Sequence, residues 1–584
     1  MAPRPWRARA RALGALALEN RLTLGIAALL IWVVGAPIVF LLSFSVRRGS
    51  PINPGELTLS NYTTILTNSL TVPAVMNTLL YAGVVSIVGL SIAALFAWLI
   101  ERTDMPGRGF AWAVMLLPLA MPGMLASMAW ILLLSPKIGL LNLPVRGLLD
   151  MFGIHLATGP FDIFTLGGMI FIESIRGSTA LFLMMVGAFR LMDPALEEAA
   201  QVAGAGRLRT LRRITLGLML PALLAAGMYA FLGNLDDFET PLLVGLPAGV
   251  FVLPTLIYFT AYQGLEFGLA AGYASFFMLV TVVMVVIYYR VILRNAERYA
   301  SITGKGFRPR RMSLGVWRYP AFALFAFYTF VTIGLPVLVL VWASLLPYYQ
   351  VPSPELMGLI GLQNYATVFT EPTILKSLIN TVVLATVTAS ATMGLAFGVS
   401  WVVVRLRVRA GAILDAIAFI PHAIPTAAVG LALVVFYLSP AIRWLPIYGT
   451  MWIMVLALMT RYLAFGTRTS NSAMTQLGKE LEEQAATSGA GRGRTLWKVT
   501  FPLLMPAFVA GWIWVFAHVF RNLTIPLMLA TPGNETIAST LYAYWERKAD
   551  FSLASALGVL LLAGMAATIV VARRFVVRGY TRDA

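Results

Sequence analysis

The sequence predicts an all-α protein that crosses a membrane about twelve times, as two tandem six-helix modules. Composition, repeated apolar segments and an internal repeat lead to this fold class. Of the 584 residues, 59% are hydrophobic and 12% are charged, and the mean hydropathy is +0.82, which is too apolar for a water-soluble protein. A helix satisfies its own backbone groups and needs about 20 apolar residues to cross a bilayer core about 30 Å thick. Repeated stretches of that length therefore indicate a membrane bundle.

The composition also excludes several kinds of site. The chain has no cysteine, so disulfides, thiolate metal sites and cysteine nucleophiles are excluded. His155, His422 and His518 are too far apart in the sequence to form a zinc site among themselves. We therefore expect no metal site, no cofactor and no catalytic residue in this chain.

Twelve apolar spans are separated by short polar connections. The first of them, from Leu22 to Val46, carries no charge. It is longer than the apolar core of a signal peptide and has no small-residue cleavage site at its end, so we expect a retained helix. The spans lie near residues 24–46, 77–100, 111–135, 166–189, 217–240, 268–289, 319–345, 378–404, 411–437, 449–467, 503–530 and 553–572.

The positive charges predict the topology. The net charge is +18, with 43 Lys and Arg. When the connections are assigned alternately to two sides, 33 of these residues fall on one side. Because basic loops stay in the cytoplasm, both termini are expected there. The charge is spread over seven segments without stacking aromatic residues, which favours a topology signal over nucleic-acid binding.

An internal repeat divides the chain. Residues 196–206 recur at 481–491, displaced by 285 residues, and an upstream register displaced by 303 residues pairs Asn61-Tyr62 with Asn364-Tyr365. The difference predicts a net insertion of 18 residues in the first copy, which we place around 141–165. We predict two modules, 1–292 and 319–584, joined by a basic cytoplasmic linker, 293–318. Six helices per copy give parallel repeats, which usually enclose a pathway at their interface.

The best-matched stretch of the repeat is a polar cytoplasmic loop, where function tends to reside. In the first copy Asp193-Pro194 can start a helix, the Ala, Leu and Glu residues that follow favour it, and Gly204 and Gly206 can end it. A basic run follows. The pattern predicts a short helix, a glycine turn and a second helix that enters the membrane.

The same loop resembles a known signature. Glu-Ala-Ala, three residues, Gly, nine residues and Ile-x-Leu-Pro is the pattern of the inner-membrane permeases of binding-protein-dependent ABC importers. Gly217 replaces the final proline in the first copy, while Gln484 and Phe501 replace Ala and Leu in the second. The matching residues are Glu198, Ala199, Ala200, Gly204, Ile214 and Leu216 in the first copy and Glu483, Ala485, Gly489, Val499 and Pro502 in the second.

The resemblance implies a fused double permease of the type I importer fold in a bacterial cytoplasmic (inner) membrane. Each loop would form a coupling helix against one of two cytoplasmic ABC ATPase subunits, and an external binding protein would deliver a small-molecule or ion substrate. The coupling residues implied are Glu197, Glu198, Ala199, Ala200 and Gly204 in the first loop and Glu482, Glu483, Ala485 and Gly489 in the second.

The chain has no loop that could hold nucleotide phosphates. Lys479 is followed by Glu480, and Lys305 by Gly306, so neither Gly-Lys pair belongs to a phosphate-binding motif. We expect a transporter subunit and not an enzyme, with ATP hydrolysed by the separate ATPase subunits.

Ionisable residues within apolar spans are costly and mark candidate pathway or gate positions. Asp236, Asp237 and Glu239 lie near the external end of a span, and the repeat places Arg521 at the position of Asp236. Arg176 and Arg461 are equivalent to each other, and Glu173, one turn away, is the expected partner of Arg176. The competing interpretation is that these charges sit at the wet interface or neutralise one another.

The sequence leaves alternatives open for the transported substrate and for the class of membrane protein. Fused double permeases of this size resemble the ferric-iron and thiamine systems, and residues 238–258 look most like ferric-iron permeases. Thiamine, polyamine, phosphonate and inorganic anions stay open. A secondary transporter also has repeated halves but no evident use for a duplicated cytoplasmic loop. A membrane prenyl-group transferase would need clustered acidic ligands, whereas Asp236-Asp237 is the only adjacent aspartate pair.

Overall fold

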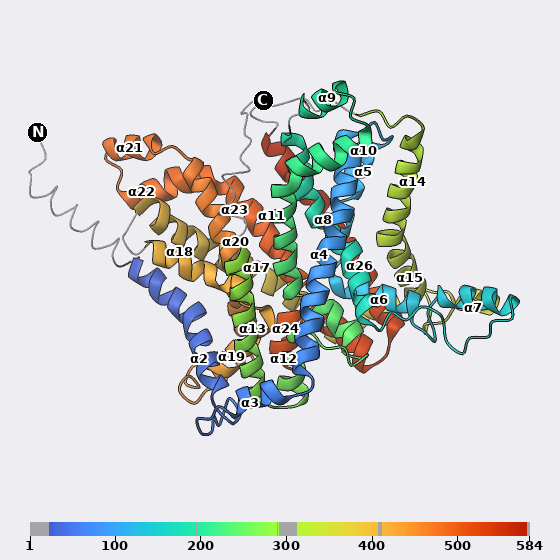
Figure 1. The fold of residues 1–584 in the computed structure, drawn as a ribbon. Helices are drawn as coiled ribbons and strands as arrows, with labels where there is room; N and C mark the ends of the chain where they lie inside the picture. Colours follow the sequence, from blue (N-terminus) through green and yellow to red (C-terminus); the bar gives the residue numbers. More distant parts are fainter. Residues whose placement is uncertain are drawn as a thin grey trace, which may run out of the picture.

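The computed structural model describes residues 21, 23–192, 195–288, 290, 312–406 and 411–580, and its helices run side by side in one bundle (Figure 1). The helices of the first module are α2 (Ala36–Ser45), α3 (Ser60–Thr67), α4 (Thr71–Arg102), α5 (Arg108–Val114), α6 (Gly123–Leu134), α7 (Asn142–Met151), α8 (Leu166–Leu191), α9 (Ala195–Val202), α10 (Arg207–Thr210), α11 (Leu216–Leu235), α12 (Leu253–Tyr258) and α13 (Phe267–Tyr288).

The second module has a similar succession of helices along the chain. Its helices are α14 (Arg318–Thr329), α15 (Leu335–Ser344), α16 (Gln363–Thr370), α17 (Pro372–Ser400), α18 (Gly411–Phe419), α19 (Thr426–Leu438), α20 (Met451–Gln476), α21 (Glu480–Thr487), α22 (Arg492–Thr495), α23 (Phe501–Phe520), α24 (Thr524–Leu529), α25 (Ile537–Tyr542) and α26 (Phe551–Tyr580).

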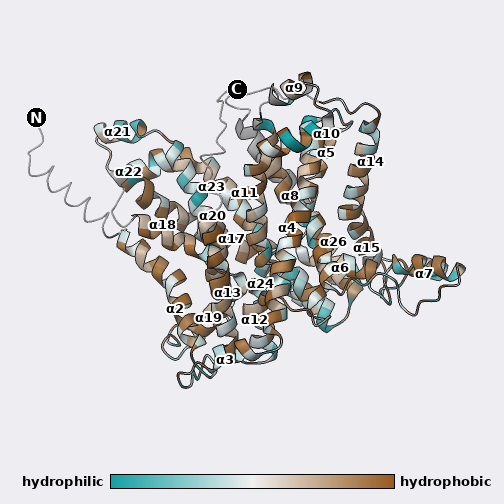
Figure 2. Cartoon of the chain, viewed as in Figure 1, coloured by the Kyte–Doolittle hydropathy of each residue, from teal (hydrophilic) through white to brown (hydrophobic). Residues whose placement is uncertain are grey.

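The expected all-α membrane fold is confirmed. Eight described helices are long and apolar enough to cross a membrane, or ten when each of two bent pairs is taken as one span. The remaining two expected spans correspond to α20 and α26. Figure 2 shows the apolar residues along the central helices and polar residues gathered near α10 and α21, at the end of the bundle that carries the two repeated loops.

Four expected spans need correction. Those near 111–135 and 411–437 are not straight: the pairs bend by 94° before α6 and by 108° before α19. A residue that precedes proline is pushed out of the helical region, and Met121 and Ile424, before Pro122 and Pro425, are extended. The spans expected to end near 240 and 530 end at Leu235 and Phe520, because polar residues follow there and contact the other module.

The first helix of each module packs on the opposite module. Val34 and Leu30, preceding α2, share a core with residues of α17, α18 and α20. Phe325 and Tyr328 of α14 belong to the core of α4 and α8, and the Tyr328 hydroxyl lies 2.6 Å from the Ser178 hydroxyl. Figure 1 shows this exchange, with α2 beside α18 and α19, and α14 beyond α4 and α8. The two modules are therefore interlocked.

A chain cut within the linker should accordingly still assemble. We expect fragments 1–292 and 293–584, produced together with an affinity tag on one, to co-purify, because each exchanged helix buries apolar area against the other fragment. A matched first fragment that begins at residue 47 lacks α2 and should be recovered in clearly lower yield. Equal recovery of both pairs would contradict the importance of the exchange.

The end of the linker is tied to the first module, while residues 293–311 lie outside the described residues. The Met312 N–H donates to the Arg102 carbonyl at 2.8 Å, and the Leu314 N–H donates to Asp104 at 2.7 Å. This backbone hydrogen bond lowers the pKa of the Asp104 carboxyl. The linker thus reaches the same loop that follows α4.

The insertion lies between α6 and α8. That connection runs from residue 135 to 165 and contains α7, whereas α19 and α20 are joined by residues 439–450. The extra length predicted in the first copy therefore forms an added helix outside the repeat.

Candidate functional site

The two repeated polar loops have the predicted helix, turn and helix. α9 is followed by Gly204 with φ +83°, and α21 is followed by Gly489, also with φ +83°. Glycine adopts this left-handed conformation without the penalty that a Cβ adds. Asp193 and Pro194, the expected start of the first helix, lie outside the described residues.

Glu197 holds the first loop against the bundle. Its carboxylate is ion-paired with Arg102, at the end of α4, and accepts the Thr215 hydroxyl at 2.5 Å. The Arg102 guanidinium also lies 3.5 Å from the carbonyl of Met192, which ends α8. The Arg102 side chain is 2% exposed and that of Glu197 is 9% exposed. The interaction is therefore a buried one.

The second loop has the same arrangement. Glu482 is 3.0 Å from Arg405 and accepts the Thr500 hydroxyl at 3.1 Å. Arg405 donates to the Leu477 carbonyl, at the end of α20, at 2.9 Å. Each member is the repeat equivalent of a residue in the first loop. We call Arg102–Glu197–Thr215 and Arg405–Glu482–Thr500 the arginine clamps.

The other predicted coupling residues lie on the exposed side. Ala199 and Glu483 are exposed, and Ala200 and Ala485 are half-buried. The side chain of Glu198 lies outside the described residues. Figure 1 places α9 and α21 apart from each other at one end of the bundle, each projecting beyond the spans. The clamps hold one face of each loop, and the opposite face stays open to a partner.

The acidic segment after α11 connects the two modules. Asp236 accepts the Thr426 N–H and the Thr426 hydroxyl, each at 2.6 Å, and pairs with Arg461 at 2.8 Å. Thr426 begins α19 and Arg461 lies on α20. A carboxylate at a helix N-terminus is stabilised by the free N–H groups there. Asp236 of the first module thus caps a helix of the second.

Glu239 makes the matching contact within its own module. It accepts the Met124 N–H, at the start of α6, at 2.9 Å. A Cβ at Gly123 would lie 2.8 Å from Glu239 Oε2, so glycine leaves room for the carboxylate. Asp237 accepts the hydroxyl of Tyr81. The acidic segment therefore reaches the N-termini of α6 and α19, the helices that follow the two bends.

The predicted basic residues take different partners. Arg176 pairs with Glu173 at 2.6 Å, as the spacing predicted. Arg521 donates to the Leu119 carbonyl, at the bend before α6, at 2.8 Å. Asp236 and Arg521, equivalent in the repeat, thus each contact the bend of the opposite module. Among the described residues, no group of three His, Cys, Asp or Glu could hold a metal ion.

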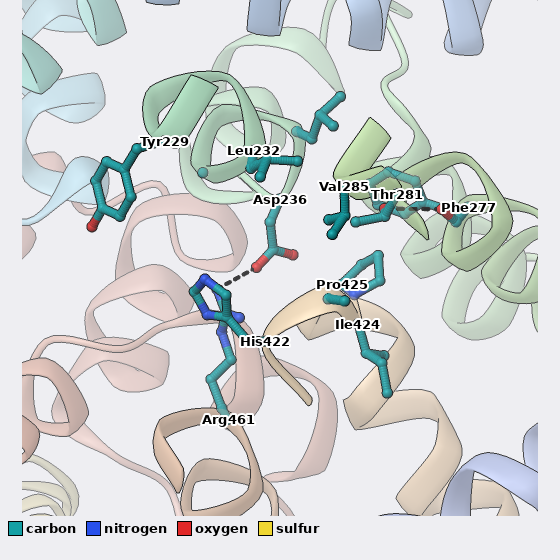
Figure 3. A pocket seen from close by; sticks show the side chains of 13 residues that line it. Tyr229, Leu232, Asp236, Phe277, Thr281, Val285, His422, Ile424, Pro425 and Arg461 are labelled. Atoms are coloured by element: carbon teal, nitrogen blue, oxygen red, sulfur yellow. Dashed lines mark hydrogen bonds and ion pairs between the residues drawn. The ribbon is translucent and has the colours of Figure 1, made fainter. Parts of the chain in front are cut away.

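A cavity of about 150 Å³ lies beside the Asp236–Arg461 pair. Its walls come from α11 and α13 of the first module and from the bend and α20 of the second. Figure 3 shows the Asp236 carboxylate beside His422 and Arg461, with Tyr229 at one side and Thr281 at the other. The cavity is therefore an inter-module one, where the repeat predicts a pathway.

The sequence interpretation missed several of these residues. Arg102, Arg405, Thr215 and Thr500 complete the clamps, and Tyr81 and Thr426 hold the acidic segment. A signal existed for the clamps, since Arg102 and Arg405 are displaced by 303 residues and Thr215 and Thr500 by 285. Tyr81 and Thr426 had no such signal.

Comparisons with known proteins agree with this architecture. Residues 390–580 match the model of the family described as binding-protein-dependent transport system inner membrane component. The ferric transport system permease protein FbpB of Actinobacillus pleuropneumoniae is 24% identical over 531 residues, 87% of this chain and 71% of that protein. An Fe(3+)-transport system permease protein of Haemophilus influenzae is 22% identical over 90% of this chain and 93% of its own length.

A shorter relative is more similar over its span. The molybdenum transport system permease protein ModB of Escherichia coli is 30% identical over 191 residues, 32% of this chain and 77% of that protein. The helical bundle, its duplicated loops and these matches lead to one conclusion. The chain belongs to the family of binding-protein-dependent transport system inner membrane components and is a multi-pass membrane permease.

Proposed function

We propose that this chain is the complete permease of an ATP-driven importer, with one polypeptide in place of a permease dimer. Two ABC ATPase subunits dock on α9 and α21 in the cytoplasm, where both termini also lie, and an external binding protein docks at the opposite end. The observation that carries the proposal is the equivalent pair of arginine clamps, buried in the first loop and partly buried in the second, which join each docking helix to its bundle.

The proposed solute is ferric iron. Relatives that span most of this chain are named as ferric transport permeases. The acidic segment supports the same choice, because Asp236 puts its carboxylate beside the inter-module cavity, and oxygen donors suit hard cations. The nearby Arg461 and Arg521 and the molybdenum permease relative favour an oxyanion as the second candidate.

The mechanism follows from the contacts. A movement of the ATPase subunits shifts α9 and α21, and the clamps pass that shift to α4 and α11 in one module and to α17 and α23 in the other. α11 ends at the acidic segment, which holds the N-termini of α6 and α19. A rigid-body rotation of the modules would then break the Asp236 contacts and open the cavity between them.

The glycine turns provide the first test. Replacing Gly204 and Gly489 together by alanine should reduce uptake of radiolabelled ferric iron at least about tenfold, because each Cβ opposes a left-handed turn at a cost of about 1–2 kcal/mol. Both positions have open space around them, so backbone conformation alone is tested. We expect ATP hydrolysis by the assembled complex to continue, uncoupled from uptake.

Gly206 and Gly491 are the matched controls. They lie two residues further on, also in open space and without positive φ, so their alanine variants should transport normally. Equal transport by both double variants would contradict the coupling role. Iron uptake unaffected by deleting the wild-type chain, in cells without another iron importer, would reject iron and leave the permease class. A tagged chain that transports without any ATPase subunit would instead indicate a secondary transporter.

A further inference from the structure

The added helix of the first module, α7, is amphipathic, and its apolar face is exposed toward the C-terminal end of the helix, whereas Leu141 at its start packs on the core. At about 100° per residue, Leu141, Val145, Leu148 and Phe152 fall within about 60° of one another, while Arg146 and Asp150 lie on the other side. Leu148 is 58% exposed and Phe152 is 75% exposed. A helix with this division of residues is typical of the plane between water and lipid.

The position of α7 agrees with that plane. It projects sideways from the bundle at the level where α15 ends (Figure 1), and its residues alternate between apolar and polar (Figure 2). Tyr349, in the loop after α15, donates its hydroxyl to the Leu132 carbonyl at 2.6 Å and lies 3.4 Å from the Ile138 carbonyl. Trp342, on α15, donates its indole N–H to the carbonyl of Gln350, the residue after Tyr349, at 3.0 Å. Tyr and Trp mark the membrane interface.

The N-terminal end of α7, its root, is held in place by hydrogen bonds. Asn142 is 1% exposed, and its amide donates to the carbonyls of Leu134, Ser135 and Phe161 at 2.8–3.1 Å. Its side-chain oxygen accepts the Phe161 N–H at 3.1 Å. A Cβ at Gly159 would come within 2.5 Å of the Asn142 side chain. The insertion is therefore built to hold the helix in a fixed orientation.

We propose that α7 lies in the external surface of the bilayer, with Leu148 and Phe152 among the lipid acyl chains and Arg146 and Asp150 in the headgroup water. Its apolar face then continues the lipid-facing surface of the spans. Because only residues 135–141 separate α7 from α6, α7 anchors the helix whose N-terminus contacts Glu239. The second module has no counterpart in the short connection between α19 and α20, so the anchor is one-sided.

An external protein is the other possible occupant of this face, and the geometry disfavours it. α7 points away from the centre of the bundle (Figure 1), whereas the inter-module cavity lies between α11, α13 and α20. A binding protein seated over that cavity would have to reach beyond α15 to cover Phe152. Lipid at the membrane surface would cover Phe152 where it lies.

Site-directed spin labelling tests the proposal in the full chain, which has no native cysteine. Single cysteines at Leu148, Phe152, Arg146 and Asp150 are labelled in proteoliposomes of phosphatidylethanolamine and phosphatidylglycerol. Collisions with oxygen, which concentrates in lipid, and with a water-soluble nickel chelate are then compared. We expect labels at 148 and 152 to be at least threefold more accessible to oxygen relative to nickel than labels at 146 and 150.

Equal nickel accessibility at all four positions would overturn the proposal. So would labels at 148 and 152 that face water until the binding protein is added and are covered only then, since the face would belong to that protein. Asn142→Ala serves as the control for orientation: it removes the fixed root, and the difference between the two faces should shrink.

Discussion

Replacing Arg102 and Arg405 together by alanine is expected to reduce ATP-dependent uptake severely while the chain still inserts and still binds its ATPase subunits. Each substitution leaves a carboxylate, Glu197 or Glu482, without its counter-charge. Removing one partner of a buried ion pair costs about 3–5 kcal/mol, enough to detach the docking helix from α4. The cost is smaller at the second clamp, because the Glu482 side chain is 19% exposed. The measurement is the number of ATP molecules hydrolysed per solute imported, which should rise steeply.

Arg190 is the matched control for this experiment. It pairs with Glu101 at 2.7 Å at the same end of the bundle, but its side chain is 54% exposed. Such surface pairs contribute about 0–1 kcal/mol, so Arg190→Ala should transport almost normally. A double variant of the clamps with an unchanged ratio of ATP to solute would show that the clamps do not transmit motion. Partial recovery with lysine at 102 and 405 would support the charge pairing.

The second large effect is expected at the contact between the modules. Asp236→Asn and Arg461→Gln should each weaken the resting state and raise ATP hydrolysis in the absence of the binding protein. A double-mutant cycle on unfolding free energy should give a coupling of at least about 1.5 kcal/mol, as found for close charge pairs. Asparagine keeps an oxygen for the Thr426 N–H, so the cycle isolates the ion pair.

Arg468 and Asp415 provide the comparison cycle. They are 3.0 Å apart within one module, and the Arg468 side chain is 50% exposed. Their coupling should stay below about 1 kcal/mol, and basal ATP hydrolysis should not change. If both cycles gave the same small coupling, Asp236 and Arg461 would be surface charges that neutralise each other. The contact that holds the two modules together would then lie elsewhere.

Some of the site was readable from local pattern. The ion pair of Glu173 and Arg176 follows from a spacing of three residues on one helix, and the turn at Gly204 follows from glycine after a run of helix formers. The bends before α6 and α19 could have been read from Pro122 and Pro425, which exclude a helical residue before them. The continuous apolar composition concealed them.

The sequence by itself determined the membrane class, the positions of most spans, the duplication and the two repeated loops, because hydropathy and helix-capping residues act over a few neighbouring residues and can be read along the chain. Only the tertiary structure decided how the halves interlock. The exchange of α2 and α14, the capping of α19 by Asp236 and the burial of Glu197 against Arg102 join residues far apart in the chain. Burial and charge pairing depend on which helices become neighbours, and spacing within one segment does not carry that information.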